Sequence, residues 1–170
     1  MSRLDHQERF CELLERSHAR WTGIARAYAP PDDRDDLVQE IAMHVWKGLD
    51  RFAGRSELDT WAYRIALNTA MAWKRKAKGR SEKLKRTAQD VAALPGDKTP
   101  ETEVTAVLDR FLASLSKADR AVMLLYLDGV PNADAASVLG TTEGALRVRL
   151  HRIRTRFEAA HGPGEGDDAV

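Results

Sequence analysis

Residues 141–157 show a strongly amphipathic pattern with a narrow apolar face. At about 100° per residue, four apolar side chains fall in one arc. They are Leu146, Leu150, Ile153 and Phe157. The opposite face and its flanks carry Arg147, Val148, His151, Arg152, Arg154 and Thr155. Five arginines and no acid lie between residues 147 and 156. A helix that is anchored on one side and basic on the other suits the major groove of DNA, although a solvated basic helix would show the same pattern.

Capping signals before this segment predict a helix-turn-helix. Asn132 is placed to cap a short helix, Gly140 to end it in a left-handed conformation, and Thr141 to cap the arginine-rich helix. Upstream, Ser116 and Asp119 form a capping-box-like start for one more helix. A helix, a short glycine-containing turn and an arginine-rich helix together indicate a compact DNA-binding module.

Elsewhere the periodicity is that of helices, and no segment alternates like a β-strand. Helices are predicted over residues 3–28, over residues 32–49, and from a cap at Ser56–Asp59 into a lysine-rich run. The pattern then fades into a polar stretch until Thr99–Glu101 restarts a helix. We therefore predict an all-α protein with two small helical domains joined by a flexible polar linker.

Composition narrows the class of protein. The chain has 170 residues and one cysteine, Cys11, which fits a reducing compartment. The mean hydropathy is -0.47. No apolar run is long enough to span a bilayer, and the amphipathic amino-terminal residues do not resemble a signal peptide. A cytoplasmic protein that is not inserted in a membrane is expected.

The net charge of +1 conceals strong segregation of charge along the chain. Residues 64–86 hold nine Lys and Arg against one acid, whereas residues 32–40 hold five acids against one base. Residues 87–109 are again acidic, with five acids and one lysine. Two basic blocks separated by acidic ones indicate two contacts with nucleic acid on one molecule.

The second and third predicted helices differ in their polar faces. In the second, the face opposite the apolar stripe carries Asp36, Gln39, Glu40, Met43 and Lys47. It is either a solvated acidic face or a surface that docks a partner. The third helix is apolar nearly all round, with a thin polar strip of Arg64, Asn68 and Arg75. Asn68 is either a core amide or a contact to a base or phosphate.

Parts of the sequence are compatible with two other classes of protein. The carboxylates Asp32, Asp33, Asp36 and Glu40 could form a nuclease metal site, but acids at a helix start are the more common explanation. No phosphate-binding glycine loop, nucleophile motif or metal-ligand spacing is present, so we expect no enzyme activity, no metal and no cofactor. The second class is a dimeric helix-turn-helix regulator that binds a DNA palindrome by itself.

Three motifs in order carry a more specific resemblance. They are DDLVQE at 35–40, LDRFAGRSELDTWAYRIALNTA at 49–70, and the helix-turn-helix ending in LRVRLHRIR. Together they resemble bacterial RNA polymerase sigma factors of the sigma-70 family, in the extracytoplasmic-function (group 4) subfamily. The resemblance covers about residues 8–158 and implies a transcription initiation factor. It implies a sigma-2 domain and a sigma-4 domain with no sigma-3 domain between them.

The resemblance also implies roles for particular residues. Contacts to the beta-prime clamp helices of core RNA polymerase fall on Asp36, Gln39 and Glu40. Reading of the promoter -10 element falls on Asn68, Arg64, Arg75, Ser56 and Trp61, with the loop 53–59 holding a flipped-out base. Phosphate contacts fall on Lys74, Lys76 and Lys78. Reading of the -35 element falls on Arg147, Val148, His151 and Arg152. Trp61, Tyr63 and Trp73 are candidates for stacking on unpaired bases, although most aromatic rings in so apolar a helix are expected to be part of the core.

The implied domains divide the chain into four parts. These are sigma-2 at 1–86, a linker at 87–98, sigma-4 at 99–161, and an acidic tail at 162–170. The implied partners are core RNA polymerase, through the beta-prime clamp helices and the beta flap, and promoter DNA. Many relatives are also held inactive by an anti-sigma factor, so such a partner is compatible with this chain.

Overall fold

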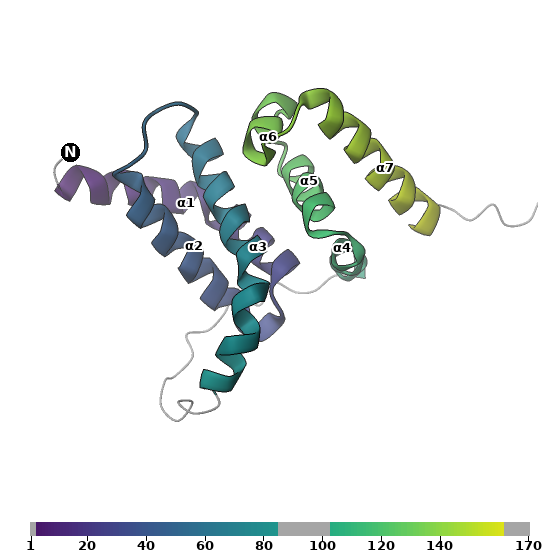
Figure 1. Cartoon of the computed structure of the whole chain (residues 1–170), viewed down its shortest axis with the longest axis horizontal. Helices are drawn as coiled ribbons and strands as arrows, with labels where there is room; N and C mark the ends of the chain where they lie inside the picture. The colour runs from purple at the N-terminus through teal and green to yellow at the C-terminus, as the bar shows by residue number, and fades with distance from the viewer. Residues whose placement is uncertain (1–2, 85–102, 162–170) are drawn as a thin grey trace, which may run out of the picture. The chain divides into compact units, whose positions relative to one another are not determined.

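The computed structural model describes residues 3–84 and 103–161, and these residues divide into helices as Figure 1 shows. The elements are α1 Arg3–Tyr28, the 3-10 turn η1 Pro31–Asp33, α2 Arg34–Leu49, α3 Leu58–Leu84, α4 Glu103–Ser114, α5 Lys117–Leu127, α6 Asn132–Leu139 and α7 Glu143–His161. No strand occurs in these two ranges, which confirms the all-α prediction. Contacts divide the chain into two compact units, residues 1–113 and residues 114–170.

In the first unit α1, α2 and α3 each pack against the other two. The buried face of α2 repeats every four residues, at Leu37, Ile41, Val45 and Leu49. This spacing keeps the apolar side chains on one stripe of a helix, as the sequence pattern predicted. On α1 the largest fully buried side chains are Trp21, Tyr28, Leu13 and Ile24. Burial of these stripes is the main source of stability for helices of this length.

The connection from α2 to α3 is held by contacts that are distant in sequence. The Trp61 ring packs so closely on Gly48 that a Cβ there would lie 3.0 Å from the indole. Asp59, predicted to form a cap with Ser56, instead accepts from Arg16 Nε on α1, at 2.9 and 3.2 Å. The helix begins at Leu58, one position later than a Ser56 cap requires. The predicted cap is therefore wrong, because α3 begins one residue too late for Ser56 to be its N-cap.

By its contacts α4 belongs to the first unit up to Ala113. Asp109 on α4 accepts from Arg26 Nη2 on α1 at 3.1 Å. The helix restart predicted at residues 99–101 lies outside the described residues, as do the predicted linker at 87–98 and the acidic tail at 162–170. The four-part division of the chain stays a prediction.

In the second unit the predicted start of α5 is confirmed. Ser116 is the N-cap, and its hydroxyl accepts from the Asp119 amide at 3.1 Å. The same hydroxyl donates to the Asp119 carboxylate at 2.7 Å. This reciprocal pair satisfies an amide that the first helical turn would leave free. The helix packs on both α6 and α7.

The helix-turn-helix differs from its prediction by one residue at each helix start. Pro131, not Asn132, occupies the N-cap of α6, and its carbonyl accepts the first helical bond from Ala135. Thr142, not Thr141, caps α7 and accepts from the Ala145 amide at 3.2 Å. Gly140 has the predicted left-handed conformation, with φ 64 and ψ 39. A glycine suits this position because it has no Cβ to clash.

Replacing Gly140 by alanine should destabilise the α6–α7 turn by about 1–2 kcal/mol, because a Cβ disfavours the left-handed conformation. Gly144→Ala is the matched control, since a Cβ there meets open space in the first turn of α7. Amide hydrogen exchange in the full chain measures both variants. Protection of α6 and α7 should fall about fivefold or more in Gly140→Ala and stay level or rise in Gly144→Ala. Equal protection in the two variants would contradict this account of the turn.

Candidate nucleic-acid interface

Helix α7 is anchored by a narrow buried stripe. Leu146 and Ile153 are 3% and 2% exposed, while Leu150 and Phe157 are half-buried. The helix packs against α5 and α6 through this stripe. The apolar arc predicted from the sequence is thus the core-facing side of the helix.

The four residues predicted to read a -35 element lie on the solvent side of α7. Arg147, His151 and Arg152 are exposed, and Val148 is 56% exposed. An exposed valine among cations offers an apolar contact, which is how proteins recognise a thymine methyl group. The structure therefore brings the four side chains together on one accessible face, in the way that a major-groove contact requires.

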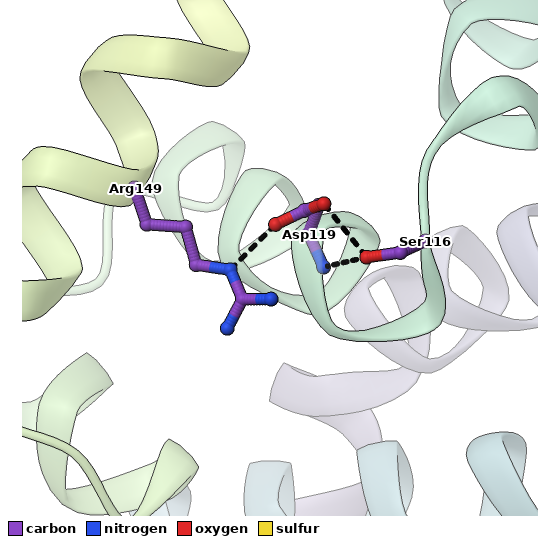
Figure 2. Close-up of polar contacts among 3 residues, drawn as sticks. All are labelled: Ser116, Asp119 and Arg149. Atoms are coloured by element: carbon purple, nitrogen blue, oxygen red, sulfur yellow. Dashed lines mark hydrogen bonds and ion pairs between the residues drawn. The ribbon is translucent and has the colours of Figure 1, made fainter.

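One flank of α7 is tied to the start of α5. Arg149 Nε donates to Asp119 Oδ1, and Asp119 Oδ2 accepts from the Ser116 hydroxyl, as Figure 2 shows. Partial burial of Asp119 opposes ionisation. Hydrogen bonds from Ser116 and Arg149, with the charges of Arg149 and Arg156, outweigh burial and hold the pKa of Asp119 below its ordinary value. Asp119 is therefore a carboxylate at neutral pH.

A groove of about 650 Å³ lies between the start of α5 and this flank of α7. Its lining residues are Asp119, Gly144, Ala145, Val148, Arg149, Arg152, Ile153 and Arg156. Three arginines face one acid, so the groove is cationic. The groove was not predicted from the sequence. Asp119 lies 30 residues before Arg149, and no pattern within α7 indicates it.

The other flank of α7 contacts the end of α5. The Arg154 guanidinium lies over the Tyr126 ring, 5.8 Å from its centroid. Arg154 also lies 3.9 Å from Glu158 one turn along α7. A cation over an aromatic face is stabilised by the ring quadrupole. Arg154 is thus held by its own unit.

In the first unit, Asn68 is the exposed position in a largely buried part of α3. Its neighbours Leu67 and Thr69 are 1% and 7% exposed. Thr69 Oγ1 lies 3.0 Å from His44 Nδ1, which joins α3 to α2 beside Asn68. The amide of Asn68 is therefore presented from a fixed helix surface.

The other residues predicted to read the -10 element have mixed placements. Ser56, Trp61 and Arg64 are half-buried, and Trp61 lies against Phe52 with ring centroids 5.2 Å apart. Tyr63 and Trp73, predicted as candidates for base stacking, are 3% and 2% exposed. For these two rings the core alternative is confirmed and stacking on bases is excluded, because both rings are buried. The side chains of Lys74, Arg75, Lys76 and Lys78 lie outside the described residues, although their backbone is part of α3.

The outer face of α2 carries the predicted polymerase contacts. Asp36 and Gln39 are exposed and Glu40 is half-buried. Two large apolar side chains accompany them, Met43 and Trp46, which are 45% and 37% exposed. The Trp46 ring is edge-on to His6 and Phe10 of α1, at centroid distances of 4.2 and 5.0 Å. The sequence pattern placed Met43 on this face but gave no sign that Trp46 borders it, because that depends on how α1 packs.

Among the described residues no group of three or more His, Cys, Asp or Glu side chains could hold a metal ion. Within the same part of the chain no helix is both long enough and apolar enough to cross a bilayer.

Comparison with known proteins agrees with this geometry. Residues 13–80 match the family model of sigma-70 region 2, and residues 105–157 match that of sigma-70 region 4. The ECF RNA polymerase sigma-E factor of Escherichia coli (strain K12) is 30% identical in an alignment of 169 positions, which covers 89% of this chain and 86% of that protein. The chain belongs to the extracytoplasmic-function sigma factors of the sigma-70 family. It is thus an RNA polymerase sigma factor for transcription initiation, from a family of non-catalytic factors.

Further relatives of this sigma factor span most of its length. The ECF RNA polymerase sigma factor SigM of Mycobacterium tuberculosis is 28% identical over 150 residues, covering 87% of this chain and 74% of that protein. The solved structure of CnrH in complex with the cytosolic domain of CnrY matches with a TM-score of 0.65 and 26% identity, over 91% of this chain and 88% of that one. RpoE of Bartonella quintana, solved with the anti-sigma factor NepR, matches with the same TM-score at 23% identity, covering 91% of this chain and 95% of that one.

Replacing Asp119 by asparagine should destabilise the second unit at neutral pH but have little effect in acid. The folded-state pKa of Asp119 lies below the ordinary value of 3.8, so its carboxylate stabilises the fold above that pH. This contribution is lost as the pH falls through the lowered pKa. Urea unfolding followed by circular dichroism at about pH 7, 5 and 3 should show the difference from wild type narrowing in acid. A difference that stays constant across this range would rule out the ionised pair as its cause.

Proposed function

We propose that this sigma factor binds core RNA polymerase, directs it to promoters by reading the -35 and -10 elements, and promotes strand opening. The observation that best supports this proposal is that one chain presents two separate polar surfaces on packed helices. One is the exposed basic face of α7, and the other is Asn68 on the otherwise buried surface of α3. Each surface suits a different form of DNA.

The α7 surface suits duplex DNA at the -35 element. Arginine donates two parallel hydrogen bonds to guanine, and each such pair contributes roughly 1–3 kcal/mol of discrimination. Arg147 and Arg152 are exposed and project from the solvent side of the helix, together with His151. Val148 adds a candidate contact to a thymine methyl group. These four residues are our proposed -35 readers.

The α3 surface suits a single strand at the -10 element. A base held in a pocket cannot pair again, so its capture favours the open state of the promoter. Unstacking costs a few kcal/mol, roughly, which contacts to the captured base must offset. Asn68 and Arg64 on α3, with Ser56 and Trp61 at or near the loop 53–59, are the proposed contacts. Lys74, Arg75, Lys76 and Lys78 would add salt-dependent phosphate binding.

The outer face of α2 suits the polymerase. Exposed Asp36 and Gln39, with Glu40, share this face with exposed Met43, so it combines acidic and polar groups with an apolar side chain. Protein interfaces commonly have an apolar core inside a polar rim. We propose that it docks on the beta-prime clamp helices and that the second unit contacts the beta flap. The relative CnrH was solved with a protein partner, and an anti-sigma factor is a further proposed partner here.

Run-off transcription tests the proposal directly. The purified chain is added to core RNA polymerase on genomic promoter fragments, and promoter-specific transcripts are expected only when both are present. Core polymerase alone is the control. Autonomous binding of the chain to a DNA palindrome, together with no specific transcript from any fragment, would instead indicate a helix-turn-helix regulator.

The two surfaces of the first unit should separate by mutation. Asn68→Ala is expected to reduce open-complex formation about tenfold or more, the loss of one good base contact, while core binding stays near wild type. Glu40→Lys should do the reverse, because it places a cation on the acidic docking face. Permanganate reactivity of unpaired thymines measures opening, and competition for core polymerase measures docking. If Asn68→Ala reduces both to the same extent, its assignment to the -10 element is wrong.

A further inference from the structure

We propose that the groove between α5 and α7 binds a backbone phosphate of duplex DNA, with Arg149 as its main donor and Asp119 as the residue that positions it. The inference rests on the proposed function, because it requires α7 to lie against duplex DNA. Most residues that line the groove are not among the proposed -35 readers. Only Val148 and Arg152 belong to both sets.

The Arg149 side chain is held in a fixed position. Asp119 is held within its own helix start by Ser116, through bonds of 2.7 and 3.1 Å. Its remaining oxygen accepts from Arg149 Nε. Among the described residues, Arg149 has no hydrogen bond or ion pair other than the one from Nε to Asp119. Figure 2 shows one terminal nitrogen on the Asp119 side of the guanidinium and the other directed away from Asp119. The N–H groups of the outward nitrogen are therefore available on a side chain that is already oriented.

The groove carries a net positive charge. Arg152 and Arg156 line it together with Arg149, and Asp119 is the single acid in the lining. The arrangement keeps an excess of two positive charges after the Asp119 carboxylate is counted against the three arginines. Arginine binds phosphate with two parallel hydrogen bonds, and its prior orientation by Asp119 reduces the entropy lost on binding. A phosphate is thus the ligand that this groove fits.

The groove lies where the DNA backbone would run beside α7. A helix with its side chains is about 10–12 Å wide, and the major groove is about 12 Å wide. A helix lying in it therefore has a sugar–phosphate backbone along each flank. The groove is on one flank of α7 and shares Val148 and Arg152 with the proposed base-reading face. Bases under that face and a phosphate in the groove belong to one continuous contact.

The test is a salt titration of promoter binding by the assembled holoenzyme. Arg149→Gln should weaken binding to a promoter with the matching -35 element and to one with a scrambled -35 element by the same factor. The slope of log affinity against log salt should become shallower by about 0.9, the value for one phosphate contact. The advantage of wild type should therefore shrink about threefold between roughly 50 and 200 mM salt. Arg149→Lys keeps the charge and should retain the slope.

Arg110→Gln is the matched control, since it removes one positive charge from α4 in the first compact unit. The proposal is overturned if Arg149→Gln changes the slope no more than Arg110→Gln does, or if the loss is confined to the matching promoter. A gain in affinity would also overturn it and would indicate that an acidic protein segment occupies the groove. Arg147→Ala separates this inference from the proposed function. If it abolishes the preference for the matching promoter while Arg149→Gln behaves like the control, only the phosphate site is wrong.

Discussion

The narrow buried stripe of α7 is the interaction on which the DNA-binding unit depends. Leu146 and Ile153 anchor the helix against α5 and α6 with little more than two fully buried side chains. Burial of each contributes about 1.5–3 kcal/mol, which must hold the helix in spite of repulsion among five arginines. Because so little of the circumference is used for packing, most of the helix remains available to DNA. A wider apolar face would stabilise the unit but would remove cationic positions from the solvent side.

In the first unit, by contrast, the helix that carries the proposed DNA contact is packed over most of its surface. Its α3 is enclosed by α1 and α2, and small residues at Ala62, Ala66 and Ala70 are fully buried between the helices. Close packing of this kind leaves few alternative positions for the helix. Asn68 is consequently presented on a rigid surface. Such rigidity suits a site that must hold a base against re-pairing, because motion of the site would weaken the capture.

The sequence was sufficient for the helices and for some of their caps, and insufficient for contacts between helices. The Ser116–Asp119 cap and the left-handed Gly140 depend on neighbours within a few residues, and both were predicted correctly. Thr142, and not the adjacent Thr141, caps α7, because the cap position depends on the direction of the chain after Gly140. The periodicity of apolar residues does not determine that direction. Asp59 is engaged by Arg16, 43 residues away. The candidate site was predicted as a set of exposed positions on α7. The groove beside it was not, because it is formed by a second helix.

The arginines of α7 differ in how their own unit holds them, and this suggests a division of work. Arg149 is tied to Asp119 and Arg154 lies over Tyr126, whereas the side chains of Arg147 and Arg152 make no polar contact with the other described residues. A phosphate occupies nearly the same position in every duplex, so a side chain that binds one gains from being fixed in advance. Base edges differ from site to site, and a reader needs freedom to find its hydrogen-bonding partners. The held arginines therefore suit the backbone, and the unheld ones suit the bases.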